Sequence, residues 1–420
     1  MKLLIKKATI VSPTSPLNGT IKDIFIVNGI IKKISANITE KASKTIEQKG
    51  LCISIGWVDI FAHFCDPGLE YRETIETGLA AAAAGGFTDV CVLPNNSPVT
   101  DNKSQVEYIK QKATTYAVNI HPIGAITKNA EGKELAEMYD MQNSGAVAFS
   151  DGINSLQSSG VMLKALQYVR AFDGTIIQLP DDKSIGANGI VNEGIVSTQL
   201  GLPGKPTMAE ELMVARDLKL ARYTDSKIHF TGISSSKSLE YIKRSKETGI
   251  KVTCSIAPYS LFFTDEDIKT YNTNLKLNPP LRTEKDRQAL INGIKNKTID
   301  CISSHHIPQN WDGKTCEFEY AKNGMIGLET LYSCLQTTLT DLPVEQLIEM
   351  LTTNNRKIVG LPIPQIKEGE IACITLFNPN TTYTFDETMI KSKSKNSAFI
   401  GQKLTGKVIG IINGDKIEMN

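Results

Sequence analysis

The sequence predicts an α/β protein, a (β/α)8 barrel accompanied by a small β domain made from both chain ends. From residue 51 to 367, short apolar runs typical of buried strands alternate with helix-like stretches, which is the pattern of parallel βαβ units. Eight such units fit a closed barrel. Short apolar runs separated by turn residues, typical of strands, fill residues 1–50 and occur again at 368–420. These two stretches are therefore expected to form the second domain together.

The first expected strands lie close to the N-terminus, beginning with Leu3–Val11. Asn28-Gly29 separates the apolar runs Ile24–Val27 and Ile30–Ile34, which predicts a two-residue hairpin. The C-terminal strands are expected at Ile371–Phe377 and at 406–415.

The barrel strands are expected at intervals along the middle of the chain. An open, doubly wound sheet is the competing architecture, but no Gly-x-Gly-x-x-Gly motif follows the first of these strands. Helices are predicted between the strands, for example at Glu73–Ala84, Ser104–Thr114, Thr207–Ala221 and Ser236–Glu247. The predicted strands are Trp57–Phe64, Thr88–Leu93, Val118–Ile123, Ala146–Phe149, Gly174–Leu179, Lys227–Thr231, Lys251–Cys254 and Asp300–Ser303.

Charge and composition argue against several classes of protein. The chain has 46 basic and 45 acidic residues and a net charge of +1, so neither nucleic acid nor an acidic membrane surface is expected as its main partner. No apolar run reaches the roughly 18 residues of a membrane helix, and the first one is too short for a signal peptide, so a cytoplasmic protein is expected. The eight Cys include no Cys-x-x-Cys pair, which favours buried free thiols over zinc clusters or disulfides.

The stretch from Gly56 to Gly68 carries the most specific pattern. Alternate side chains of a strand share a face, so Asp59, Phe61 and His63, with Cys65 after them, are expected to point toward the barrel interior. The stretch resembles the first-strand motif of the dihydroorotase and hydantoinase branch of the amidohydrolase superfamily, Gly-x-x-Asp-x-His-x-His-x-Arg-(Asp/Glu)-Pro-Gly. The resemblance implies zinc ligands at the positions of Phe61 and His63 and a carboxylate-binding Arg at that of Cys65. Only His63 keeps the residue type of the family.

The ends of later strands continue the resemblance, which runs from about residue 3 to 418. Asn95 matches an Asn that binds substrate in the family, although Asn is also common in turns. Asp151 either keeps a zinc-ligand position or serves only as a capping or turn residue. Gln178 and Gly232 replace two zinc-binding His, and His305 replaces the Asp that is both zinc ligand and proton shuttle.

Two further positions complete the expected site. Asn278 lies in an intact Asn-Pro-Pro-Leu-Arg loop close to the substrate in the family, and Gln309 replaces a substrate-contacting His. His229 matches a non-ligating position and is interpreted as a core histidine. His305 and its neighbour His306 cannot easily converge on one ion, because adjacent strand residues face opposite ways.

These departures decide the expected function. The family uses two zincs, held by four His and carboxylates, to make a hydroxide and open a cyclic amide. Of the positions that the resemblance implies as zinc ligands, only His63 and Asp151 keep the residue type, so no cofactor is expected, or at most one weakly held zinc. We therefore expect a dihydroorotase homologue of pyrimidine biosynthesis that has lost catalysis. The resemblance implies a β-sandwich of 1–50 and 368–420 beside the barrel, and aspartate transcarbamoylase or a second copy of the chain as partner.

Two alternatives stay open. The first is an active dihydroorotase or related cyclic amidase, hydrolysing dihydroorotate to N-carbamoyl-aspartate with one metal on His63, Asp151 and His305. The second is a barrel whose emptied pocket serves a different ligand or contacts between copies of the chain. Cys65 as a nucleophile is not favoured, because the sequence shows no base paired with it.

Overall fold

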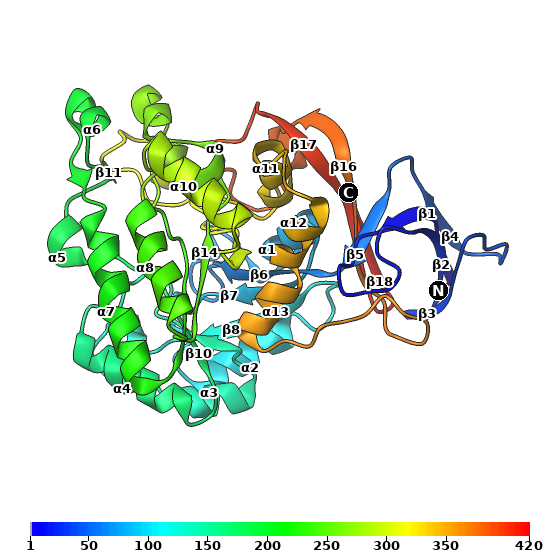
Figure 1. The fold of residues 1–420 in the computed structure, drawn as a ribbon, viewed down its shortest axis with the longest axis horizontal. Coiled ribbons are helices and arrows are strands. Elements are labelled where there is room, and N and C mark those ends of the chain that lie inside the picture. Colours follow the sequence, from blue (N-terminus) through cyan, green and yellow to red (C-terminus); the bar gives the residue numbers. More distant parts are fainter. Residues whose placement is uncertain (1) are drawn as a thin grey trace.

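In a computed structural model, which describes residues 2–420, the middle of the chain forms a parallel barrel and both chain ends join in a second sheet (Figure 1). The barrel strands are ordered as in the sequence, and an N–H···O bond of 2.9 Å from His63 to His306 closes the ring between its first and last members. Sequential order and closure confirm the predicted barrel and exclude the open, doubly wound sheet. The strands are β6 (Trp57–Ala62), β7 (Phe87–Val92), β8 (Asn119–Gly124), β9 (Ala148–Phe149), β10 (Thr175–Gln178), β13 (Lys227–Phe230), β14 (Val252–Ile256) and β15 (Cys301–Ile302).

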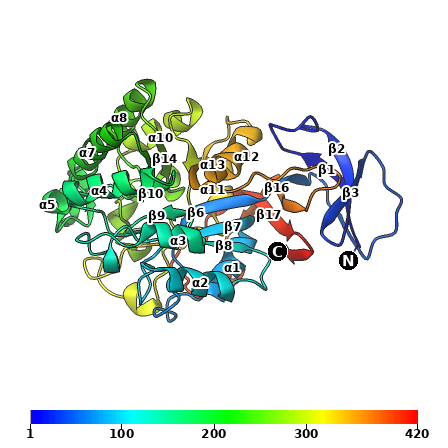
Figure 2. The same cartoon turned by 90° about the horizontal axis from the view of Figure 1, so that it is seen from below.

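Helices surround these strands, with α2 and α3 on one side and α7, α8 and α10 on the other (Figure 2). Thr74 and Asn102 cap α1 and α2 with their side chains, which explains where these helices begin. The small residues of α1 let it pack closely on the barrel, with Leu79 and Ala82 buried. The main helices are α1 (Ile75–Ala84), α2 (Lys103–Lys112), α3 (Met138–Ser144), α4 (Ser159–Arg170), α7 (Met208–Thr224), α8 (Ser236–Glu247), α10 (Glu284–Lys295), α11 (Leu331–Thr338), α12 (Val344–Leu351) and α13 (Thr353–Val359).

Short elements are inserted where the barrel loops are longest. Between β10 and α7 the chain forms α5 (Lys183–Gly186), β11 (Val191–Asn192), α6 (Ile195–Leu200) and β12 (Gly204–Lys205), and α9 (Tyr259–Phe262) follows β14. No helix among residues 2–420 is both long and apolar enough to cross a bilayer.

The second sheet combines the two chain ends as predicted. Asn28 and Gly29 both have positive φ in the hairpin between β2 and β3, as the sequence pattern requires. A bridge from Ile30 to Ile371 brings the outer strand β3 back to the start of the C-terminal strands, so the sheet curls around its own apolar core. Its strands are β1 (Lys2–Ile10), β2 (Ile21–Val27), β3 (Ile30–Ser35), β4 (Lys44–Glu47), β5 (Cys52–Ile55), β16 (Cys373–Thr384), β17 (Lys403–Asn413) and β18 (Lys416–Met419).

The junction between the two parts positions the candidate site. Only Gly56 separates β5 of the second sheet from β6 of the barrel, so β6 enters the barrel from that sheet and ends at the far side. Trp57 packs against Phe87, Tyr332 and Phe377 at the junction. The loop between β16 and β17 reaches back across the barrel, where the side chain of Asn396 accepts a hydrogen bond from the Gln309 backbone. Residues from the C-terminal segment therefore help to shape the mouth of the barrel.

Candidate functional site

A cavity of about 620 Å³ lies at the C-terminal ends of the barrel strands, where barrels of this kind place their chemistry. Much of its wall is apolar or aromatic, formed by Phe61, Ile153, Leu179, Tyr259, Leu277 and Ile307. Its polar lining includes Arg72, Asn278, His305, Gln309, Asp312 and Lys322. Of the residues predicted for the site, the structure thus brings Phe61, Asn278, His305 and Gln309 to one cavity.

Phe61, His305 and Gly232 share one volume at this mouth. The rings of Phe61 and His305 are stacked, with centroids 4.5 Å apart. A Cβ on Gly232 would lie 2.7 Å from Cε1 of His305, closer than real contacts allow. The space that a side chain at 232 would occupy is therefore filled by His305. Burial lowers the pKa of the His305 imidazole to about 3, and its Nε2 lies 2.8 Å from the hydroxyl of Thr231.

His63 is fully buried and bonded on both ring nitrogens. Its Nε2 lies 3.1 Å from the carbonyl oxygen of Asn95, which can only accept, so Nε2 carries the proton. Nδ1 then accepts from the thiol of Cys65, whose Sγ lies 3.5 Å away. Burial, followed by the charge of Arg72, lowers the pKa of His63 to about 3, and burial raises that of Cys65 to about 12. A base does lie beside Cys65, contrary to the expectation from sequence, but this thiol is buried and stays protonated.

Asp151 supports a loop. Its Oδ1 accepts from the backbone N–H groups of Ile126 and Thr127 at 2.9 Å, and its Oδ2 accepts from the Thr127 hydroxyl at 2.6 Å. Asn95 bonds to the same region, donating to the Asp151 carbonyl and accepting from the Ile153 backbone N–H, both at 3.0 Å. Both polar atoms of the Asn95 side chain are thus used within the protein, and Asn95 does not line the cavity.

Gln178 also lies outside the cavity. It is buried, makes contacts of 3.4–3.5 Å to Ser155 and Leu156 in the loop after β9, and also hydrogen-bonds to the carboxyl group of Asp217. Asn278 lies at the cavity wall, where its oxygen accepts from Lys205 at 3.0 Å. Gln309 donates its amide to the carbonyl of Asn323 at 2.7 Å.

His306 and His229 have separate partners. His306 Nδ1 accepts from the Gly327 backbone N–H at 3.2 Å, and its Nε2 faces Glu73 at 3.4 Å, away from His305. His229 is buried between the hydroxyls of Thr253 and Ser255, and burial lowers its pKa to about 3. These contacts are those of satisfied core histidines.

The side chains at the positions of the family's zinc ligands do not fit a zinc centre. Phe61 and Gly232 offer no ligand atom, and Gln178 offers a neutral amide, a poor zinc ligand beside imidazole or carboxylate. The other three positions carry His63, Asp151 and His305, but these side chains bond to other groups of the protein. Among residues 2–420, no three His, Cys, Asp or Glu side chains gather so as to hold a metal ion. The three-ligand, single-metal arrangement considered from the sequence is therefore not assembled.

Comparison with known proteins identifies the family. A family model described as Dihydro-orotase-like matches residues 50–238. A dihydroorotase from Acetivibrio thermocellus is 42% identical over 420 residues, covering 99% of this chain and 98% of that protein. The chain belongs to the dihydroorotase family. A second relative, a dihydroorotase from Syntrophus aciditrophicus, is 39% identical and is matched over 97% of both chains.

Solved structures place the dihydroorotase-family chain in the same fold as hydantoinases. An L-hydantoinase (dihydropyrimidinase) from Arthrobacter aurescens superposes with a TM-score of 0.86 at 22% identity, covering all of this chain and 97% of the other. A D-hydantoinase gives a TM-score of 0.82 at 20% identity. The resemblance identified from the first barrel strand is thus confirmed for family and fold.

Most residues that line the dihydroorotase-family cavity were not predicted from the sequence, among them Arg72, Tyr259 and Lys322. Arg72 comes from the loop between β6 and α1, Tyr259 from α9 and Lys322 from the long segment after β15. The position of Arg72, four residues after the Asp66-Pro67-Gly68 turn, is the one available signal, because a loop that follows a barrel strand surrounds the mouth. Nothing in the sequence around Tyr259 or Lys322 distinguishes them.

Proposed function

We propose that this member of the dihydroorotase family binds a ligand or a protein partner at its barrel and no longer performs metal-assisted hydrolysis. The stacking of Phe61 on His305, in the volume that a side chain at 232 would need, carries this proposal. Opening a cyclic amide at neutral pH needs an activated hydroxide, a Lewis acid on the carbonyl and a group that moves a proton. A stacked pair of rings supplies none of these functions.

Proton transfer is the second reason. A general base works best when its pKa lies near the operating pH. His305 stands at the position of the family's proton shuttle, but burial lowers its pKa to about 3. At neutral pH it is a neutral ring with little affinity for a proton, so it is poorly matched to that role.

The proposed role lies in pyrimidine biosynthesis, the pathway that the family resemblance implies. A barrel of this family without hydrolysis serves pyrimidine biosynthesis as a structural partner, either of aspartate transcarbamoylase or of a second copy of the chain. Co-expression with the aspartate transcarbamoylase of the same organism, followed by size-exclusion chromatography, tests this part. Co-elution of the two proteins in a defined ratio supports the hetero-complex. A dimer of this chain without the transcarbamoylase supports self-association. A monomer, both in the co-expressed sample and when this chain is run alone, contradicts the role.

The loss of hydrolysis is tested on the protein purified from zinc-supplemented medium. We expect well below one zinc per chain by elemental analysis and no conversion of dihydroorotate. The dihydroorotase of Acetivibrio thermocellus, assayed in parallel, is the positive control. About two zincs per chain together with turnover would overturn the proposal.

The second candidate is an active dihydroorotase with an unusual site. Full-length identity of 42% to a protein of that name favours it. Two results would distinguish it. A chelator would abolish turnover of dihydroorotate, and His63→Ala would slow turnover by raising the activation free energy by several kcal/mol.

A further inference from the structure

A second cavity, of about 900 Å³, lies where the barrel meets the sheet made from the chain ends. We call it the junction cavity. It is lined by residues 12–17 of the loop between β1 and β2, by α13, and by residues 363–368 of the linker that leads from α13 to β16 (Figure 1). It shares no lining residue with the cavity at the barrel mouth. Its volume is within the range of small-molecule sites, so it is a candidate binding site of its own.

Two closely surrounded hydroxyl groups of the junction cavity lack a partner in the protein. Ser12, in the loop between β1 and β2, is 6% exposed, and Thr353, in α13, is 7% exposed. Both residues line the cavity, and neither hydroxyl forms a hydrogen bond within residues 2–420. Neither oxygen is fully enclosed by the protein, so both are open to the cavity. Hydroxyl groups in such surroundings are usually hydrogen-bonded, so a polar ligand would find one unused group on each side of the junction.

The charged side chains of the junction cavity have an excess of positive charge. Lys357 of α13 and Lys367 of the linker both line it, and neither forms an ion pair within residues 2–420. Glu368 is the only carboxylate among the described lining residues, and its Oε1 already accepts from the backbone N–H of Ile34 at 2.7 Å. The charged lining side chains therefore sum to +1, which favours an anionic ligand.

The other lining groups narrow the chemistry of this anion. The hydroxyl of Thr14 and the amide of Gln365 add further hydrogen-bond donors. Lysine binds phosphate as a point charge, whereas none of the described lining residues is an arginine, whose fork of donors matches a carboxylate. Much of the remaining wall is apolar, so an organic group has a surface to pack against; this wall includes Leu17, Ile34, Ile363 and Ile366.

We propose that the junction cavity binds an organic phosphate, with the phosphate group on Lys357, Lys367 and the unused hydroxyls and the organic group on the apolar wall. Such a ligand contacts the loop between β1 and β2, α13 and the linker at once, so it ties the barrel to the second sheet. The inference goes beyond the function proposed for the barrel. It holds or fails independently of whether the barrel hydrolyses a cyclic amide.

Matched pairs of probes test the proposal by isothermal titration calorimetry on the full chain, in a buffer without phosphate. AMP is compared with adenosine, and phenyl phosphate with phenol, so that each pair differs only in the phosphate group. We expect each ester to bind at least tenfold more tightly than its neutral counterpart and than inorganic phosphate. Equal affinities within both pairs, or no binding of either ester at about 5 mM, would overturn the inference. Inorganic phosphate that binds as tightly as both esters would contradict the organic part of the ligand.

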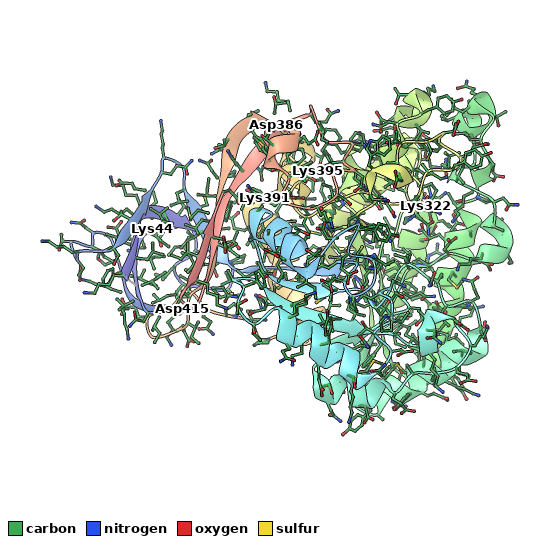
Figure 3. All side chains as sticks on the ribbon, turned by 180° about the vertical axis from the view of Figure 1, so that it is seen from behind. Lys44, Lys322, Asp386, Lys391, Lys395 and Asp415 are labelled. Atoms are coloured by element: carbon green, nitrogen blue, oxygen red, sulfur yellow. The ribbon has the colours of Figure 1, made fainter. Side chains whose placement is uncertain are left out.

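Substitution of the two lysines locates the interaction. Lys357→Gln and Lys367→Gln should each weaken binding of the esters by about tenfold, because a charge-assisted hydrogen bond is lost. The double variant should bind each ester no more tightly than its neutral counterpart. Lys44→Gln, at an exposed cation of the second sheet (Figure 3), is the matched control and should leave binding unchanged. Unchanged binding in the double variant contradicts the assignment.

Two further variants separate the junction cavity from the barrel mouth. Lys322→Gln removes a cation from the other cavity, on the barrel side of the molecule (Figure 3), and should leave binding of the esters unchanged. Thr353→Val keeps the shape of the side chain and removes its hydroxyl, so it should weaken binding of the esters by about 2–10-fold. Loss of binding in Lys322→Gln with full binding in Thr353→Val would place the ligand at the barrel mouth and overturn the inference. Circular dichroism and thermal melting of each variant establish that it is folded before binding is measured.

Discussion

At the residue scale, His305 and Gly232 depend on each other for space. A Cβ at 232 would lie 2.7 Å from Cε1 of His305 and 3.0 Å from Cδ1 of Leu179. Gly232 also has φ +67°, a left-handed conformation that costs most other residues about 1–2 kcal/mol. The two costs are separable, because only the first depends on the His305 ring.

This dependence predicts non-additive substitutions. Gly232→Ala is expected to lower the free energy of unfolding by about 2–4 kcal/mol in the native background and by about 1–2 kcal/mol in His305→Ala. Urea denaturation of the native chain, Gly232→Ala, His305→Ala and the double variant gives the coupling free energy between positions 232 and 305. Gly201 has the same φ of +67° with open space around it, so Gly201→Ala should cost the same in both backgrounds. Additive behaviour at 232 would mean that His305 does not fill the site.

Asp151 offers a residue-scale test of metal ligation against support of a loop. Its carboxylate accepts three hydrogen bonds from Ile126 and Thr127, so Asp151→Ala should lower the free energy of unfolding by about 2–4 kcal/mol. The loss should be the same in zinc and in chelator, as measured by urea denaturation. Asp415→Ala, at an exposed site of the second sheet, should change little (Figure 3). A loss that occurs only with zinc present would indicate a ligand.

At the scale of elements, the strands were predictable and the contacts at their ends were not. Apolar runs and turn residues locate all eight barrel strands, because burial and periodicity are local properties of the sequence. The contact between Cys65 and His63 depends on the left-handed φ of +58° at Cys65, which a strand pattern does not contain. Arg72 reaches the cavity through the course of a loop, and loops follow tertiary packing more than local pattern.

The strand ends also predict how a metal centre could be regained. A chain with Phe61→His, Gln178→His, Gly232→His and His305→Asp would have imidazole or carboxylate at every position implied by the family resemblance. We expect it to bind about one to two zincs per chain by elemental analysis, where the native protein binds far less. The same chain without Phe61→His is the matched control and should bind less zinc. A folded variant with no gain in zinc would contradict the interpretation that these substitutions removed the centre.

At the scale of the whole molecule, three buried histidines make the stability of the fold depend on pH. His63 follows β6, His229 lies in β13 and His305 follows β15, and burial lowers each pKa to about 3. Unfolded histidine titrates near pH 6.5. Below that pH these histidines are protonated in the unfolded chain but stay neutral in the folded chain, so acid lowers the free energy of unfolding. Asp217 opposes this, because burial raises its pKa to about 6 and the folded chain binds that proton first.

The pH dependence of stability should therefore change when one histidine is removed. His229 lies between two hydroxyl groups that a neutral amide can also contact, so His229→Gln is the variant of choice. Urea denaturation from pH 7.5 to 5 should show a constant loss for this variant near pH 7.5. Below about pH 6.5 the difference in free energy of unfolding between the native chain and the variant should shrink by about 1.4 kcal/mol per pH unit. The reason is that the variant lacks one group that takes up a proton only in the unfolded state. Curves that stay parallel down to pH 5 would mean that His229 takes up its proton equally in both states, and burial would then not be the cause of its low pKa.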